Sequence, residues 1–446
     1  MANLNTILQA IVEKGSRLIE PTIQSEPPEK QIRIICDKLL SSKGEASGVA
    51  LADQTLRLYR ELTPDEQLSF FEYLATEYNP SPEEVLAAAQ DYQADQTSDK
   101  LKRLTHSCEP LRQELFRRLN FAPRGTYRLV KMREDLIRFV RSKPELKRID
   151  DDLRHLLSSW FNRGFLTLRP INWDSPAREL EKLIAYEAVH EIKGWDDLRR
   201  RTDPPDRRCF AFFHPTMPEE PLVFVEVALT DDIPNSIQEL LRENRVPSQP
   251  TDKKFAVFYS ISNCQAGLKG VSFGAFLIKQ VVTDLSRELP NLKLFLTLSP
   301  VPGFMKSLEE KFSLGDGNDD VETLRAVLKN AAAGKPLDED MSETVRKLAA
   351  DYLANSKQKN GAPKDPVARF HLGNGACLHA VHTNADLSKR GMQNASGVMV
   401  NYLYDLDKLE ARHEAFKNDG SVALSRDVSA LISAMGKVHN VKKLSA

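Results

Sequence analysis

The residues whose types and spacing could support chemistry lie in the second half of the chain. Residues 270–274 match the G-x-S-x-G pattern of a nucleophile elbow, in which Ser272 would be the nucleophile of a serine hydrolase. An elbow is a sharp strand-to-helix turn with its serine close to the end of the strand. Here residues 263–269 separate the predicted strand from Gly270, which is too much loop. The pattern therefore argues against a hydrolase.

The same segment fits a loop that binds a phosphate better. Gly267, Gly270 and Gly274 let the chain approach a ligand closely or adopt a positive φ. Free backbone N–H groups and the dipole of the helix that follows favour an anion, and Lys269 adds a full charge. The spacing is neither that of a Walker A loop nor that of a dinucleotide-binding fingerprint. A glycine-rich turn that merely packs the helix on the strand is the alternative.

Ser299 stands in the segment LSPVPGF, 298–304, directly after a predicted strand. Two prolines and a glycine end the strand and hold Ser299 at its carboxyl end, where ligands gather in open α/β sheets. A turn or helix-capping serine is the alternative interpretation, which the residues alone favour.

Metal-ligating residue types cluster in the segment FHLGNGACLHAVH, 370–382, as His371, Cys377, His379 and His382. Alternation along a strand would divide these residues between two faces, and the closed four-ligand spacing of a zinc site does not occur. We therefore expect no metal here. His371 differs from the others because HLGNG places it at the edge of a glycine turn.

The bulk composition excludes several function classes. The 446 residues carry a net charge of -1, so no global field favours nucleic acid or an anionic membrane. Five scattered cysteines without a CxxC pair fit a reducing compartment. The N-terminal segment lacks a signal-peptide pattern, and no stretch approaches the roughly 20 apolar residues of a membrane span. We expect a cytoplasmic protein without nucleic-acid or membrane partners.

The two halves of the chain have different patterns. Residues 1–165 read as successive amphipathic helices with short links, including proline-containing capping boxes at 63–66 and 81–84, and predict a helical bundle. From 166 to 446 the pattern is mixed α/β. There, strand, glycine loop, helix and strand follow one another over 254–299, which predicts a right-handed β-α-β crossover.

Several blocks together resemble the malonyl-CoA decarboxylase family, and they occur in that family's order. The blocks are FYSIS (258–262), GLKGVSFGAFLIKQVV (267–282), LSPVPGF (298–304), ARFHLGNGA (368–376) and ADLSKRGMQNASGVMVNYLY (385–404). The helical first half also matches the family's layout. The chain lacks the C-terminal SKL and the organelle leader of the animal members, so it looks bacterial.

The resemblance implies an α+β fold in two domains. Residues 1–165 would be an all-helical oligomerisation domain in a homotetramer, and residues 166–446 a catalytic domain with a mixed α/β fold like that of GNAT acyltransferases. The pyrophosphate of coenzyme A would be held by Lys269, Gly270, Val271, Ser272, Phe273, Gly274 and Ala275. Ser299 and His371 match the family's catalytic pair, and Tyr404 matches a tyrosine placed near that pair.

The implied reaction is decarboxylation of malonyl-CoA to acetyl-CoA and CO2, in fatty acid metabolism. Loss of CO2 leaves a thioester enolate, so we expect neither a metal nor an organic cofactor, since the thioester is itself the electron sink. We expect Ser299 to hydrogen-bond the carboxylate and His371 to manage the proton, without a covalent acyl-serine.

Two other classes of function stay open. A GNAT-type acyltransferase would use the same coenzyme A loop but would need an acceptor amine. A non-catalytic coenzyme A sensor or scaffold would have no use for both Ser299 and His371 in their motifs.

Overall fold

The computed structural model describes residues 4–17, 26–42, 44–271, 276–314 and 321–434. These residues form two compact units. The first comprises residues up to 166 together with the short segments 214–218 and 265–273, and the second contains the remainder.

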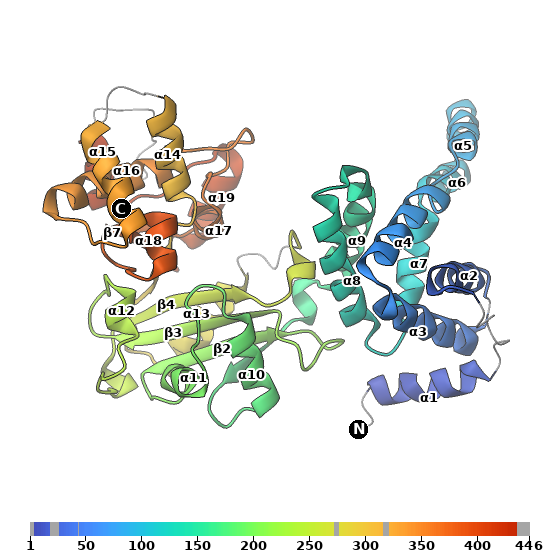
Figure 1. The fold of residues 1–446 in the computed structure, drawn as a ribbon, viewed down its shortest axis with the longest axis horizontal. Coiled ribbons are helices and arrows are strands. Elements are labelled where there is room, and N and C mark those ends of the chain that lie inside the picture. Colours follow the sequence, from blue (N-terminus) through green and yellow to red (C-terminus); the bar gives the residue numbers. More distant parts are fainter. Residues whose placement is uncertain (1–3, 18–25, 43, 272–275, 315–320, 435–446) are drawn as a thin grey trace. The chain divides into compact units, whose positions relative to one another are not determined.

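The first unit is helical. Its elements are α1 (Leu4–Ser16), α2 (Pro28–Ser41), α3 (Glu45–Glu61), α4 (Pro64–Glu77), α5 (Pro82–Ala94), α6 (Ser98–Cys108), α7 (Leu111–Leu119), α8 (Gly125–Val140), α9 (Lys147–Trp160), and the short 3-10 turns η1 (Pro144–Leu146), η2 (Arg163–Phe165) and η4 (Ala266–Leu268). One apolar core joins helices α2, α3, α4, α7, α8 and α9. Figure 1 shows these helices in blue and teal.

The helix starts follow from local sequence. Thr63 accepts a hydrogen bond from the Glu66 backbone N–H, and the Glu66 side chain accepts one from the Thr63 backbone N–H, so the predicted capping box of α4 is confirmed. Ser81 caps α5 by accepting from the backbone N–H of Glu84, but the reciprocal bond from the Ser81 backbone N–H to the Glu84 side chain does not form among the described residues, so the predicted box at 81–84 is only half formed.

The second unit is built on one mixed sheet. Its strands are β1 (Thr167–Ile171), β2 (Arg207–Phe213), β3 (Val223–Thr230), β4 (Phe255–Asn263), β5 (Leu294–Thr297), β6 (Ser299–Pro300), β7 (Cys377–His382) and β8 (Met399–Tyr404). The order is β1-β2-β3-β4-β5-β8-β6, with β7 also paired to β8. Among the strands that the structure describes, only β4 and β5 pair in parallel. A parallel pair requires a crossover, and α13 (Phe276–Glu288), which lies between β4 and β5 in the chain, supplies it, which confirms the predicted β-α-β unit.

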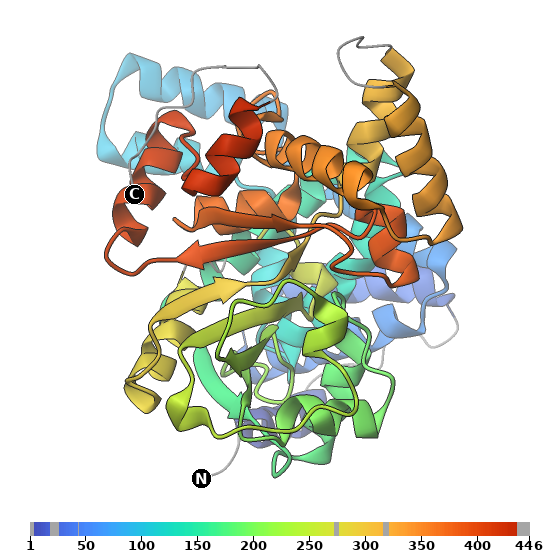
Figure 2. The same cartoon turned by 90° about the vertical axis from the view of Figure 1, so that its left-hand side faces the viewer.

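Helices accompany this sheet in two groups. The elements are α10 (Ala177–Tyr186), α11 (Trp195–Thr202), α12 (Ile237–Leu240), η3 (Pro250–Asp252), α13 (Phe276–Glu288), α14 (Phe304–Leu314), α15 (Val321–Ala333), α16 (Glu339–Asn355), α17 (Pro366–Gly373), α18 (Lys389–Ala395), α19 (Leu409–Asp419) and α20 (Arg426–Ser433). Apolar residues of α10 and α11 pack against β2 and β3. The orange-to-red helices gather around β7 and β8, where α16 and α20 contact β7 (Figure 2).

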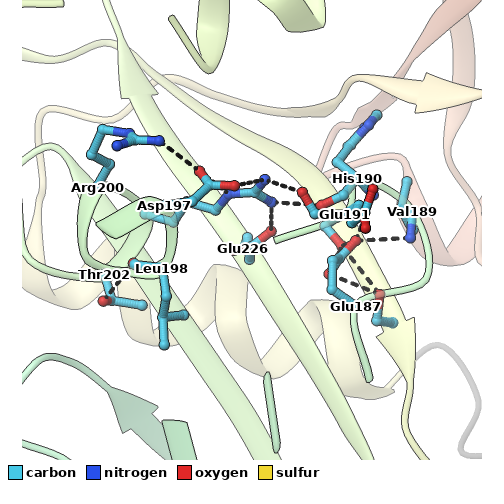
Figure 3. A network of polar contacts seen from close by, with 12 residues as sticks. Glu187, Val189, His190, Glu191, Asp197, Leu198, Arg200, Thr202 and Glu226 are labelled. Atoms are coloured by element: carbon cyan, nitrogen blue, oxygen red, sulfur yellow. Dashed lines mark hydrogen bonds and ion pairs between the residues drawn. The ribbon is translucent and has the colours of Figure 1, made fainter. Parts of the chain in front are cut away.

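A buried polar network fixes α11 to the sheet (Figure 3). The guanidinium of Arg201 donates to Glu226 at 3.3 Å and to Asp197 at 3.1 Å. It also donates to the backbone carbonyls of His190 and Glu191, at 2.8 and 2.9 Å. Glu226, on β3, has no exposed surface; burial raises its pKa, and the charge of Arg201 beside it opposes that rise. One side chain thereby holds a helix, a strand and the segment before the helix together.

A helical first part followed by a mixed sheet with helices confirms the predicted fold class. Among the helices that the structure describes, none is long and apolar enough to cross a membrane.

Candidate active site

The structure brings Ser299, His371 and Tyr404 into one chain of hydrogen bonds inside the second unit. Ser299 begins β6, His371 lies in the last turn of α17, and Tyr404 ends β8. Ser299 Oγ is 3.3 Å from His371 Nε2, and His371 Nδ1 is 2.7 Å from the Tyr404 hydroxyl. All three residues are buried, so water does not compete for these bonds.

The position of His371 follows from the cap of its helix. Asp365 precedes Pro366 at the start of α17 and accepts hydrogen bonds from the backbone N–H groups of Val367 and Ala368, both at 2.9 Å. Its second oxygen accepts from Gly303 N at 3.3 Å. Because Gly303 belongs to the turn after Ser299, one carboxylate links the serine loop to the histidine helix. Sequence reasoning missed this residue, although Asp-Pro before a helix is a recognisable start signal.

The hydrogen-bond directions assign the state of the imidazole. Ser299 donates its hydroxyl hydrogen to Thr297 Oγ1 at 2.8 Å. The Ser299 oxygen therefore accepts from His371 Nε2–H. Burial lowers the pKa of His371 to about 3, so the ring is neutral and carries a single N–H. Nδ1 then accepts from Tyr404, whose pKa burial raises well above its ordinary value.

This arrangement has a chemical consequence. A serine nucleophile needs a histidine lone pair facing its hydroxyl, and here that nitrogen presents a hydrogen instead. Such a histidine does not activate the serine as a nucleophile; it holds the serine oxygen in place.

The low pKa of His371 predicts a pH dependence of stability. The unfolded chain binds a proton on this histidine near pH 6.5, whereas the folded chain does so only near pH 3. Between these values the unfolded state holds more protons, so the free energy of unfolding contributed by His371 falls as the pH drops from 6.5 to 3. We expect His371→Gln to show a shallower loss of stability than the wild type over this window, measured by denaturation at several pH values. Equal slopes would contradict the burial of a neutral ring.

The imidazole is also held by ring packing. Tyr402 stacks on His371 with centroids 4.6 Å apart and an interplanar angle of 20°. The Tyr402 hydroxyl is buried and makes no hydrogen bond within the described part of the chain. No sequence signal pointed to Tyr402 in particular, because Tyr402 and Tyr404 lie on the same face of β8 and only their contacts distinguish them.

The other histidines of segment 370–382 do not join His371. His382 Nε2 is 2.5 Å from Asn401 Oδ1, and the backbone carbonyl of His379 accepts from Ser425. Within the described residues, no group of three or more His, Cys, Asp or Glu side chains could hold a metal ion.

The glycine loop is described only in its first part. Lys269 and Gly270 are exposed, and Gly270 has a φ of +80°, which favours glycine. Val271 is buried, whereas Ser272, Phe273, Gly274 and Ala275 lie outside the described residues. Packing explains the glycine at position 267, because a Cβ there would lie 1.8 Å from the Val130 carbonyl oxygen of α8.

Together, the mixed α/β unit and its buried serine–histidine–tyrosine chain have the form of an enzyme's catalytic unit. Two family models match the chain. The malonyl-CoA decarboxylase C-terminal domain matches residues 164–442, and the N-terminal domain of the same family matches residues 78–161.

Individual relatives that match the chain belong to the same family as the two models. Rat mitochondrial malonyl-CoA decarboxylase is 35% identical over 362 residues, which span 74% of this chain and 73% of the rat protein. The crystal structure of malonyl-CoA decarboxylase from Rhodopseudomonas palustris is 47% identical, with a TM-score of 0.86 over 91% of this chain and 100% of that one. The crystal structure of malonyl-CoA decarboxylase from Agrobacterium vitis is 47% identical, with a TM-score of 0.84 over 90% of this chain and 99% of that one.

The chain therefore belongs to the malonyl-CoA decarboxylase family. It is an enzyme of that type.

Proposed function

We propose that this enzyme releases CO2 from malonyl-CoA through a thioester enolate, and that Ser299, His371 and Tyr404 carry the reaction. The observation that supports this proposal best is that Ser299 donates its hydrogen to Thr297, which leaves His371 Nε2 as the donor in its 3.3 Å contact with Ser299 Oγ. Family membership supports the substrate.

The bond between the carboxylate carbon and the α-carbon breaks, and its electron pair moves onto the thioester oxygen as CO2 leaves. The resulting enolate then takes one proton at the α-carbon, which gives acetyl-CoA. The net reaction consumes one proton, and that proton comes ultimately from the solvent water. No metal or organic cofactor is required, since the thioester itself accepts the electron pair.

In this proposal each side chain has one task. When the substrate binds, Ser299 turns its one hydroxyl hydrogen from Thr297 Oγ1 to the departing carboxylate, which can only accept, and so orients it. His371 delivers the proton, and Tyr404 fixes the ring through its bond to Nδ1. A carboxylate brought close to His371 stabilises the imidazolium form, which raises the pKa of the histidine from its low value in the free protein. Proton uptake at His371 Nδ1, which then donates to the Tyr404 oxygen, is therefore coupled to binding of the anionic substrate.

The remaining assignments are proposals of the same kind. Residues 269–275 hold the pyrophosphate of coenzyme A, with Lys269 supplying charge and the backbone N–H groups supplying donors. Residues 1–165 form the oligomerisation domain of a homotetramer, and residues 166–446 form the catalytic domain, with a GNAT-like topology. The protein works in the cytoplasm.

The decisive experiment measures CO2 and acetyl-CoA released from malonyl-CoA by the purified wild-type protein. We expect the two products in a one-to-one ratio without any acceptor and in the presence of a chelator. If the acyl group instead leaves coenzyme A only when an amine is added, the protein is an acyltransferase. The wild type should also show no added acyl mass on Ser299 after mixing with substrate.

A further inference from the structure

We propose that Thr297 is a positioning residue that acts through Ser299. In the substrate-free protein its hydroxyl oxygen holds the hydroxyl hydrogen of Ser299, and so keeps the Ser299 oxygen turned toward His371 Nε2–H until the carboxylate takes that hydrogen. This inference rests on the proposed function in one respect, because it takes Ser299 as the residue that contacts the substrate.

Thr297 lies where the sheet changes direction. It ends β5, is fully buried, and pairs with Phe258 of β4. The pairs Leu296↔Leu403 and Ser299↔Val400 define one continuous register against β8, which places Thr297 opposite Tyr402. The ladder is interrupted between β5 and β6, and Thr297 stands in that interruption.

Polar contacts of Thr297 replace the missing ladder bonds. Its Oγ1 accepts from the backbone N–H of Tyr402 at 3.1 Å, and its carbonyl accepts from Asn401 Nδ2 at 2.7 Å. The orientation of the Asn401 amide is fixed in turn, because its oxygen lies 2.5 Å from His382 Nε2. The Thr297 side chain is therefore held rigidly before it meets Ser299.

The contact between the two hydroxyls is the shorter of those made by Ser299. Ser299 Oγ lies 2.8 Å from Thr297 Oγ1 but 3.3 Å from His371 Nε2. A hydroxyl has one hydrogen, so the group that accepts it decides which way the oxygen lone pairs face. Without Thr297 Oγ1, the Ser299 hydrogen is free to turn to His371 Nε2. That rotation places a lone pair on Nε2 and moves the imidazole hydrogen to Nδ1, away from the reacting carbon.

The test is a double-mutant cycle on CO2 release. Thr297→Val keeps the shape and removes the hydroxyl, and Thr297→Ser keeps the hydroxyl. We expect Thr297→Val to lower kcat by about 10- to 100-fold with KM within about 3-fold, because a small misplacement of a reacting group costs this much. Thr297→Ser should stay within about 3-fold of the wild type. In a Ser299→Ala background, Thr297→Val should change kcat by less than about 2-fold, since the residue through which it acts is gone.

The possible outcomes test the role of Thr297 and the role of Ser299 separately. An equal loss from Thr297→Val in both backgrounds overturns the inference, because the effect then passes through the backbone of β8, where Tyr402 N loses its acceptor. Wild-type kcat in Thr297→Val overturns it as well. If Ser299→Ala alone keeps full turnover, the proposed role of Ser299 fails, whatever Thr297 does. Should Thr297→Val not fold, Thr297→Cys, a weak hydrogen-bond partner of similar size, must show the same dependence on Ser299.

Discussion

His371→Gln is expected to lower kcat for CO2 release by about 100- to 10,000-fold, the usual contribution of a positioned proton donor. Glutamine can still offer an N–H toward Ser299 but cannot give up that hydrogen, so the variant separates proton delivery from hydrogen bonding. The measurement is steady-state release of CO2 from malonyl-CoA at pH 7. Ser299→Ala, measured beside it, should lose about 100- to 1,000-fold, as removal of one aimed hydrogen-bond donor typically does.

A matched control separates chemistry from folding. His155 is exposed on α9 in the first unit, and His155→Gln should keep turnover within about 2-fold. Both active-site variants should retain cooperative unfolding transitions. If His371→Gln keeps more than about a tenth of the wild-type kcat while folded, His371 is not the proton donor and the proposed mechanism is wrong.

The second large effect is on stability. Arg201→Leu should lower the free energy of unfolding by about 3–5 kcal/mol, because breaking a buried ion pair leaves its partner without compensation. Glu226 would lose its only cation at hydrogen-bonding distance within the described residues, and Asp197 would lose its 3.1 Å bond. The carbonyls of His190 and Glu191 would also lose their donor. The measurement is the midpoint of urea denaturation.

Arg199 provides the matched control on the same helix. Its side chain is 59% exposed and pairs with Asp203 at the surface, so Arg199→Leu should cost less than about 1 kcal/mol. The double variant Arg201→Leu with Glu226→Leu should recover part of the loss, since apolar side chains often replace a buried pair without penalty. A cost for Arg201→Leu no larger than that for Arg199→Leu would contradict the network's structural role.

Much of the architecture could be predicted because its signals are local. Capping residues such as Thr63 and helical periodicity predicted the bundle, and strand, glycine loop, helix and strand predicted the parallel pair of β4 and β5. These patterns depend on neighbours within a few residues, so the chain carries them without reference to the rest of the fold.

The contents of the site were predictable only in part. Ser299 and His371 were singled out from their motifs, but spacing alone left Ser299 open to interpretation as a capping residue. Their contact joins residues 72 positions apart, which no periodicity reveals. Tyr404 entered through the family resemblance, and its bond to His371 Nδ1 depends on how β8 pairs with β5.

By itself, the sequence determined the family, the helical first part and the mixed second part, and it singled out Ser299 and His371 as candidate reactive side chains. Only the tertiary structure decided which hydrogen each of those side chains gives and receives. Thr297 and Asp365 look unremarkable in the chain, yet one takes the hydrogen of Ser299 and the other ties its loop to the helix of His371. The physical reason is that hydrogen-bond direction and burial belong to the packed arrangement, and burial alone lowers the pKa of His371 to about 3.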